Sequence, residues 1–150
     1  MLNKIYKLRA EGKKIGFTCS TFDLLHAGHV AMLAEAKSKC DFLIVGILSD
    51  PTISRKKKNK PIQSLFERFL QLQAIECVDY IIPFESEEDL VDMLLVLLPD
   101  IRIIGEEYKD KEHTGKNIEG IENYYNSRRH HFSSTDLRER LRKLFEDEKI

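Results

Sequence analysis

Two histidines three residues apart, His26 and His29, are the first groups that could do chemistry, in the stretch "STFDLLHAGH" (Ser20–His29). They follow a predicted strand and lie where a predicted helix begins. A helix start presents backbone N–H groups and the positive end of the helix dipole, and it binds anions readily. Two imidazoles add donors to phosphate oxygens, and Gly28 lets a ligand approach the backbone closely. The spacing therefore predicts a phosphate-binding site.

Further cationic and hydroxyl groups cluster in two other segments. The loop "RKKKNK" (residues 55–60) supplies Lys56, Lys57, Lys58 and Lys60. Arg68 lies on the next predicted helix and is within reach of the same region. Near the C-terminus, Arg128 and Arg129 precede the hydroxyl groups that open the last predicted helix, which belong to Ser133, Ser134 and Thr135. Two phosphate-binding helix starts and a cationic loop together predict a triphosphate site.

Each of these groups also has a simpler interpretation. A histidine pair is often surface decoration, a lysine run is often a solvated loop, and hydroxyls before a helix are often only a cap. Ser20, Asp23 and His26 are the residue types of a hydrolase triad, but no G-x-S-x-G elbow surrounds the serine. No matching carboxylate spacing supports a metal site built from His113, His130 and His131. The combination of the three groups in chain order favours the phosphate site.

The elements that must position these groups alternate along the chain. Apolar, β-favouring runs predict strands over residues 14–20, 42–48, 79–84, 101–105 and 122–126. Helical spacing and capping residues predict helices over residues 29–40, 64–78, 86–98 and 133–148. This order predicts an α/β fold, a Rossmann-like doubly wound parallel sheet with helices on both faces, in a single domain over residues 1–150. The residues before 14 are expected to form a short mixed segment.

In such a sheet, ligands bind beyond the carboxyl ends of the strands, near a topological switch point. That rule selects four loops, over residues 18–29, 49–60, 105–120 and 128–135. All the candidate groups except Arg68 lie in these loops. The loops are therefore expected to meet around one site.

The composition is that of a globular protein, with 42% hydrophobic and 9% aromatic residues and a net charge of −1. Because the charge is nearly balanced, anion binding must come from local clusters, and nucleic acid is not an expected partner. The chain has no uninterrupted apolar run of about 18 residues and no signal-peptide core, so we expect no membrane span and a cytoplasmic location. Cys19, Cys40 and Cys77 are expected to be buried free thiols.

Three motifs carry a resemblance to a known family. "TFDLLHAGH" resembles the H-x-G-H signature of the nucleotidyltransferase superfamily, usually written G-T-F-D-L-x-H-x-G-H. "FSSTDLRERL" is similar to its second signature, and "KNKPIQSLFERFLQLQAIECVD" is similar to the segment between them. The resemblance runs from Lys14 to Leu144. Two positions depart from the usual pattern: Ser20 replaces a glycine, and Glu76 replaces the arginine that cytidylyltransferases carry there.

Two branches of the superfamily fit best. The first is glycerol-3-phosphate cytidylyltransferase, because Arg128 occupies the place of the arginine that leads the cytidylyltransferase motif. It implies transfer of CMP from CTP to a phosphorylated alcohol or polyol, with release of pyrophosphate. The alternative is the adenylyltransferase domain that forms ADP-heptose, which carries Glu at the position of Glu76 and uses ATP with a sugar phosphate such as heptose 1-phosphate. Both imply Mg²⁺ as cofactor and a homodimer.

The resemblance also implies roles for individual residues. The expected catalytic residues are His26, His29, Lys57 and Arg128. The expected nucleotide-binding residues are Thr21, Phe22, Asp23, Gly28, His29, Lys58, Arg68, Gly105, Ser133, Ser134 and Thr135. Asp23 is an expected indirect partner of Mg²⁺, with no protein ligand set for the metal itself. Candidates for ribose or base contacts are Asp50, Glu106 and Glu107, and the loop Tyr108–Asn117 is a candidate cover for the acceptor.

Two further alternatives stay open on the sequence. One is a nucleotide-binding or sensing domain without catalysis, which damaged signatures would indicate; both signatures are intact here. The other is an enzyme of the same superfamily that adenylylates a vitamin precursor. The segment from Arg55 to Asp79 is closer to the cytidylyltransferase and heptose branches.

Overall fold

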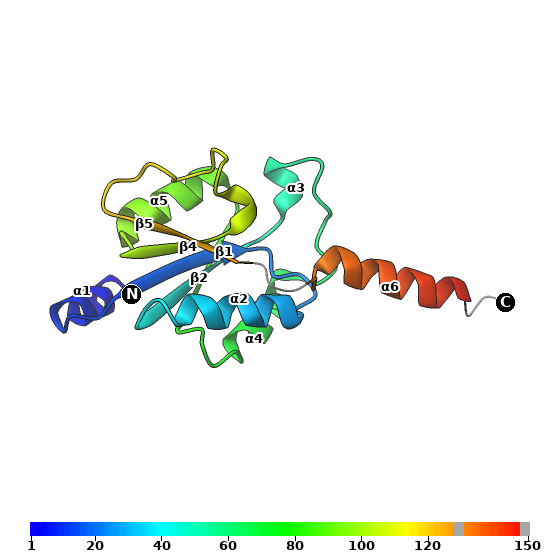
Figure 1. The fold of residues 1–150 in the computed structure, drawn as a ribbon, viewed down its shortest axis with the longest axis horizontal. Coiled ribbons are helices and arrows are strands. Elements are labelled where there is room, and N and C mark those ends of the chain that lie inside the picture. The colour runs from blue at the N-terminus through cyan, green and yellow to red at the C-terminus, as the bar shows by residue number, and fades with distance from the viewer. Residues whose placement is uncertain (128–130, 148–150) are drawn as a thin grey trace.

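The computed structural model describes residues 1–127 and 131–147 of the chain (Figure 1). Its centre is a five-stranded sheet in the order β3-β2-β1-β4-β5, with all four neighbouring pairs parallel. The strands are β1 (Ile15–Ser20), β2 (Phe42–Leu48), β3 (Tyr80–Phe84), β4 (Ile101–Gly105) and β5 (Glu122–Asn126). The chain winds outward from β1 to β3, then returns to the other side of β1 as β4. This confirms the predicted Rossmann-like fold and places its switch point between β1 and β4.

Helices cover both faces of the sheet (Figure 1). On one face lie α2 (Ala27–Lys37) and α4 (Leu65–Gln73), and on the other lies α5 (Glu87–Leu97). The side chains of β2 alternate between two cores: Phe42 and Ile44 pack with α5, while Leu43, Val45 and Ile47 pack with α2 and α4. A strand buried on both faces needs such a continuous apolar run, and for this reason the predicted and observed bounds of β2 agree.

The N-terminal segment differs from the expected short mixed segment, because residues 2–10 form a helix, α1 (Leu2–Ala10). Ile5 is 1% exposed and joins the core beneath α5. The Arg9 side chain donates a hydrogen bond of 2.9 Å from Nη2 to the carbonyl of Leu97 at the end of α5. Packing against a distant helix end therefore fixes this segment, and local pattern alone does not reveal it.

Other element bounds differ by a few residues. The helix α2 begins at Ala27, two residues before the predicted start, and α4 ends at Gln73 rather than at 78. A short helix, α3 (Pro51–Ser54), follows β2 and is capped by Asp50, where only a break was expected. The three cysteines are free and partly buried.

The last helix, α6 (Ser134–Asp147), projects away from the sheet at its carboxyl edge (Figure 1). None of its residues is buried, and its apolar residues Leu144 and Phe145 are exposed. Contacts at its first turns therefore decide where it sits. Within the described ranges, no helix has the length and apolarity needed to cross a membrane.

Candidate active site

A cavity of about 450 Å³ lies at the carboxyl edge of the sheet, beside the switch point. The ends of β1 and β4 form its floor, and the starts of α2 and α6 form one wall. The opposite wall comes from α3, the start of α5 and the loop after β4. The four loops selected from the sequence thus contribute to one cavity, apart from residues 128–130, which lie outside the described residues.

The two signature histidines cap the start of α2. His26 is the N-cap residue, and its Nδ1 accepts a hydrogen bond of 3.1 Å from the N–H of Gly28. His29 is the third helical residue, and its Nδ1 faces the N–H of His26 at 3.4 Å. The two rings stack with centroids 3.9 Å apart. Because both Nδ1 atoms accept, the neutral rings carry their proton on Nε2, which makes Nε2 the donor of each ring.

The three-residue spacing of His26 and His29 also allows the two side chains to cap the helix. An N-cap side chain and the third helical residue bond each other's backbone in a capping box, usually built from Ser or Thr with Glu or Gln. His26 and His29 use the same geometry. The cap fixes both rings, so the residues predicted to bind phosphate are held in place before any ligand binds. The sequence has the spacing of a capping box. Histidine is not a usual member of one, so the sequence pattern does not predict this cap.

The start of α6 lies directly beside the start of α2. Ser134 Oγ is 3.2 Å from His26 Nε2 and donates a hydrogen bond of 3.1 Å to the carbonyl of Asp23. Ser133 Oγ accepts a bond of 3.0 Å from the N–H of Asp136 and so caps α6. Ser133, Ser134 and Thr135 all line the cavity. The structure therefore brings together the two helix starts that the sequence singled out.

Asp23 links three segments around this wall. Its carboxylate, 5% exposed as a residue, accepts from the N–H groups of Ile62 and Gln63 at 2.9–3.0 Å and pairs with Arg138 Nη2 at 2.6 Å. Burial alone would raise the pKa of Asp23, but these hydrogen bonds outweigh it and hold the pKa below its usual value. The carboxylate is thus engaged with protein donors, and its expected indirect partnership with Mg²⁺ stays a prediction.

The loop that carries Asp23 has an unusual backbone. Phe22 and Leu24 have φ angles of 52° and 51°, in the left-handed region that non-glycine residues rarely adopt. The Phe22 side chain is 1% exposed and packs in the core beneath α2, so packing holds this conformation. Strain of this kind is typical of functional loops. Thr21, Phe22, Asp23 and Gly28 line the cavity, as expected.

Arg68 does not line the cavity, although the sequence suggested a phosphate contact. It is 2% exposed, and its guanidinium donates to backbone carbonyls. The acceptors are the carbonyl oxygens of Thr21, Leu48, Ser49, Gln63 and Ser64, at 2.6–3.3 Å. These bonds tie the ends of β1 and β2 to the start of α4. Arg68 thus holds the edge on which the cavity is built.

The basic loop contributes only in part. Lys58 and Arg55 line the cavity, whereas Lys57 does not. Gly105 lines it at the end of β4. Arg128, expected to be catalytic, lies outside the described residues. Glu76, where the family motif departs, is exposed and also lies away from the cavity, so it makes no direct contact there.

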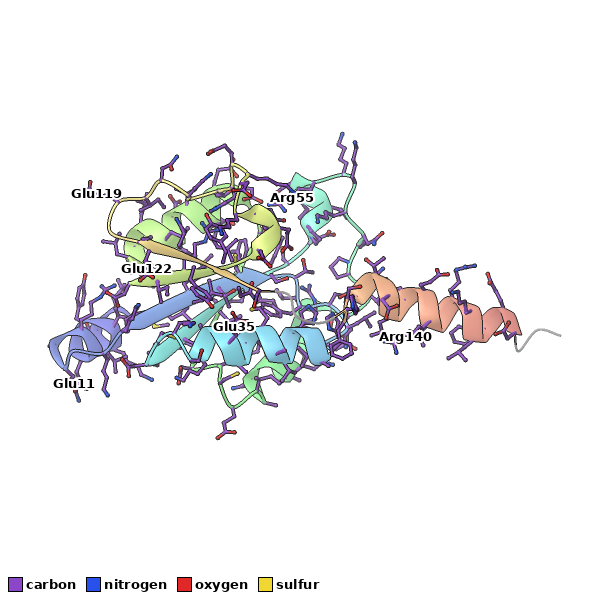
Figure 2. The ribbon with its side chains drawn as sticks, viewed as in Figure 1. Glu11, Glu35, Arg55, Glu119, Glu122 and Arg140 are labelled. Atoms are coloured by element: carbon purple, nitrogen blue, oxygen red, sulfur yellow. The ribbon has the colours of Figure 1, made fainter. Side chains whose placement is uncertain are left out.

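The opposite wall holds charged groups that were not among the predicted site residues. Arg55 Nη2 pairs with Glu87 Oε1 at 2.5 Å, and Figure 2 shows Arg55 at the end of α3. The hydroxyl of Thr114 donates a short hydrogen bond to Glu87, and Arg102 Nη1 donates one to the Thr114 carbonyl. Burial would raise the pKa of Glu87, but Thr114, Arg55 and Arg102 together hold it below its usual value. Glu87 is therefore ionised at neutral pH.

His113 and Tyr125 extend this polar wall. His113 Nε2 lies 3.1 Å from the Tyr125 hydroxyl, and burial lowers the pKa of His113, which keeps the ring neutral. The sequence offered one signal for the whole wall: Arg102 interrupts the apolar strand "IRIIG", and a charge in a buried strand is rare. The remaining groups come from separate segments and carry no local motif.

Among the residues that the structure describes, no group of three or more His, Cys, Asp or Glu side chains could hold a metal ion. The described residues therefore offer Mg²⁺ no protein cage. An ion that accompanies a nucleotide would be held by phosphate oxygens and water, as is common for Mg²⁺.

Comparison with known proteins places this site in a family. A family model described as cytidylyltransferase-like matches residues 17–140. "Bifunctional protein HldE" of a Nitratiruptor species is 42% identical over 112 residues, or 74% of this chain and 24% of that protein. The protein of the same name from Helicobacter pylori is 44% identical over 104 residues, or 69% of this chain and 22% of that protein. The chain thus spans about a quarter of the length of these curated relatives.

Two solved structures share the fold. A lipopolysaccharide core biosynthesis protein from Thermoplasma volcanium matches with a TM-score of 0.57 and 24% identity, over 89% of each chain. Pantothenate synthetase from Thermus thermophilus matches with a TM-score of 0.51 and 16% identity, over 81% of this chain and 59% of that one. The chain belongs to the cytidylyltransferase-like family, and it is a nucleotidyltransferase.

Proposed function

We propose that the protein transfers AMP from ATP to a sugar phosphate, which forms an ADP-sugar and releases pyrophosphate. The observation that carries this proposal is the capped histidine pair, which lines one cavity with a second helix start, 3.2 Å from His26 Nε2 to Ser134 Oγ. The sequence alone favoured the CTP branch. The relatives named HldE instead support the adenylyl branch. Glu76, the residue found in the heptose branch, agrees with this choice.

The acceptor phosphate is already an anion, so it needs no general base. One of its oxygens attacks the α-phosphorus in line, a new P–O bond forms, and the bond to the bridging oxygen of pyrophosphate breaks. Catalysis then depends on positioning and on neutralising charge in the transition state. In this proposal His26 and His29 donate from Nε2 to the α-phosphate and to the bridging oxygen as charge develops there.

The remaining phosphates meet the second helix start. Ser134 and Thr135, with the N–H groups of the first turn of α6, bind the β- and γ-phosphates. Lys58 lines the cavity and contributes a cation, and Lys57 and Arg128 stay in the proposal as predicted phosphate contacts. Phosphate binding and α6 docking are then linked, because Asp23 and Ser134 hold α6 in place.

A pyrophosphate-release screen tests this proposal directly. ATP, CTP, GTP and UTP are each combined with heptose 1-phosphate, glycerol 3-phosphate, pentitol phosphates, and ethanolamine and choline phosphates. We expect the strongest release from ATP with a sugar phosphate. Release from CTP with glycerol 3-phosphate alone would overturn the adenylyl assignment in favour of the CTP branch, and no release from any pair would contradict nucleotidyl transfer to these acceptors.

Two expectations from the resemblance stay predictions: the homodimer and the cytoplasmic location. Light scattering coupled to size-exclusion chromatography distinguishes a monomer of 17.5 kDa from a dimer. Fractionation of the source cells tests the location.

A further inference from the structure

Arg102 is a buried cation that forms no ion pair with a carboxylate of the described residues. It is 5% exposed and is the second residue of β4. Its neighbours Ile101 and Ile103 pack in the core beneath α2, so by strand alternation Arg102 faces α5 instead. Within residues 1–127 and 131–147, no carboxylate lies within 4.0 Å of its guanidinium. Buried charges are normally paired, because leaving a charge alone in a low dielectric is costly.

The other deeply buried arginine, Arg68, has hydrogen-bond partners for most of its guanidinium donors. Arg68 donates to five backbone carbonyls. Arg102 donates to one carbonyl, that of Thr114, and interacts with the thiol of Cys19. Both of these partners are uncharged at neutral pH, since burial raises the pKa of Cys19. Arg102 also lines the cavity, whereas Arg68 does not, so its remaining donor capacity is accessible to a ligand.

The charges around Arg102 do not balance. Arg55 and Arg102 are cations, and the ionised Glu87 between them is paired at 2.5 Å with Arg55. Lys58 and Glu107 also line this side of the cavity, so three cations face two carboxylates and the charged groups carry a net charge of about +1. One oxyanion from a ligand would neutralise the cluster, whereas an ammonium group would add to the excess positive charge.

The loop after β4 holds Arg102 in position. Gly115 has a φ of +75°, and a Cβ there would lie 2.8 Å from Arg102 Nη1 and 2.6 Å from Leu94 Cδ1. Thr114 binds both Arg102, through its carbonyl, and Glu87, through its hydroxyl. The loop thus packs closely on the guanidinium and leaves it little freedom. This is a preorganised binding group rather than a flexible surface arginine.

We propose that Arg102, with Arg55 and Glu87, forms the acceptor subsite and binds an oxyanion of the phosphorylated acceptor. The oxyanion is either the acceptor phosphate or a carboxylate on its sugar body. Glu87, Thr114 and the His113–Tyr125 pair then offer acceptors and donors to sugar hydroxyls, and phosphates of amino alcohols are disfavoured. The assignment rests on the proposed function for the identity of the acceptor, but the anion binding itself does not.

Arg102→Met tests the subsite through kinetics and stability together. We expect the KM of the sugar phosphate to rise about 10- to 100-fold, as for loss of a charged hydrogen bond, while the KM of ATP stays unchanged. The urea midpoint should stay level or rise, because an unpaired buried charge has been removed. Arg142→Leu, on the exposed face of α6, is the matched control, since Arg142 pairs with Glu139 and Glu146 outside the cavity. A fall in stability without a change in acceptor KM would overturn the proposal.

Glu87→Gln provides a second variant, for which the expected change in anion affinity has the opposite sign. Removing the carboxylate of the cluster raises its net charge, so binding of inorganic phosphate should tighten several-fold. A purely structural role for the cluster would weaken binding in both variants. Weaker phosphate binding by Glu87→Gln would therefore contradict the subsite, even if Arg102→Met fails to fold.

Calorimetric titration without nucleotide separates this inference from the proposed function. Glucose 1-phosphate and glucuronic acid 1-phosphate are titrated into wild type and Arg102→Met. Equal weakening for both ligands assigns Arg102 to the phosphate, and weakening for the glucuronic acid ligand alone assigns it to the carboxylate. Arg102-dependent binding with no pyrophosphate release from any acceptor would refute adenylyl transfer but keep the anion subsite. No binding to wild type, or equal binding of ethanolamine phosphate, would overturn the subsite.

Discussion

The two walls of the cavity present different kinds of polar group. The wall formed by the starts of α2 and α6 presents backbone N–H groups, hydroxyls and imidazoles, and its charged side chains Asp23 and Arg138 pair with each other at 2.6 Å. The wall formed by α3, α5 and the loop after β4 uses the charged side chains Arg55, Glu87 and Arg102. The first wall is rigid through its helix caps, and the second through a network of ion pairs and hydrogen bonds. The same cavity thus combines a wall of backbone and hydroxyl donors with a wall of charged side chains.

The difference suggests a division of labour. A helix start binds phosphate whatever the phosphate is attached to, which suits a nucleotide that many related enzymes share. A cluster of charged side chains recognises a particular arrangement of anions and hydroxyls, which suits the acceptor. Changes in the first wall should therefore reduce turnover with every acceptor, and changes in the second should depend on the acceptor.

The largest effect is expected for His29→Ala, which removes one Nε2 donor from the reacting phosphate. Loss of such a donor typically costs about 10²–10³ in kcat. His29→Asn is the informative companion, because its amide oxygen can still accept from the His26 N–H and keep the cap of α2. Steady-state pyrophosphate release measures both variants. Near wild-type turnover by a folded His29→Ala protein would remove the histidines from the mechanism.

The next effect concerns the two buried arginines. Arg68 binds only backbone carbonyls, whereas Arg102 lines the cavity. Arg68→Met leaves several buried carbonyls without donors, and we expect a loss of about 2–4 kcal/mol in the free energy of unfolding. Arg102→Met should cost little or nothing, because it removes a buried charge that has no carboxylate partner among the described residues. Urea unfolding of the two variants under the same conditions gives the comparison. Equal losses would mean that Arg102, like Arg68, stabilises the fold through its hydrogen bonds, and an unchanged acceptor KM in the same variant would then remove the second wall as a binding surface.

The sequence predicts the first wall of the cavity better than the second. The parallel sheet, the bounds of β2 and the approximate starts of α2 and α6 follow from local patterns, because apolar runs and caps act over a few residues. The roles of Asp23 and Arg68 do not, because their partners lie about 40 residues or more along the chain or on other elements. Both residues were expected to contact the nucleotide, and the fold shows that their charged groups also link separate segments of the chain.

The second wall was unpredictable for the same reason. Its groups come from residues 55, 87, 102 and 113–114, which only the fold brings together. Arg102 was the one available signal, since it breaks a buried strand. A charged residue that contradicts its local pattern is therefore worth treating as a site candidate on the sequence alone.

A smaller effect is expected where Asp23 joins α6 to the first wall. Asp23→Asn weakens the contacts with Ile62, Gln63 and Arg138, and we expect a loss of about 1–3 kcal/mol at neutral pH. The pKa of Asp23 is lowered in the folded protein, so its contribution is complete above about pH 4, the usual value of a free Asp, and disappears as the pH falls through the folded pKa.

Urea unfolding of wild type and Asp23→Asn between pH 7 and pH 3 measures how the contribution of Asp23 to stability depends on pH. The difference in unfolding free energy between the two proteins should be constant from pH 7 to about pH 5 and should shrink below about pH 4. The KM of ATP should rise in the variant at neutral pH, because α6 loses a docking contact. A difference that grows on acidification would contradict the assigned ion pair.

The smallest effect distinguishes two neighbouring lysines of the basic loop. Lys58 lines the cavity and Lys57 does not, although the resemblance implied a catalytic role for Lys57. If the loop keeps this arrangement when ATP binds, Lys58→Met should raise the KM of ATP about 5- to 10-fold, as for loss of a partly solvated phosphate contact, and Lys57→Met should change it less than about 2-fold. The Lys58 effect should weaken at high salt, because exposed charges are screened. An equal or larger effect of Lys57→Met would mean that the basic loop rearranges when ATP binds and brings Lys57 into the cavity.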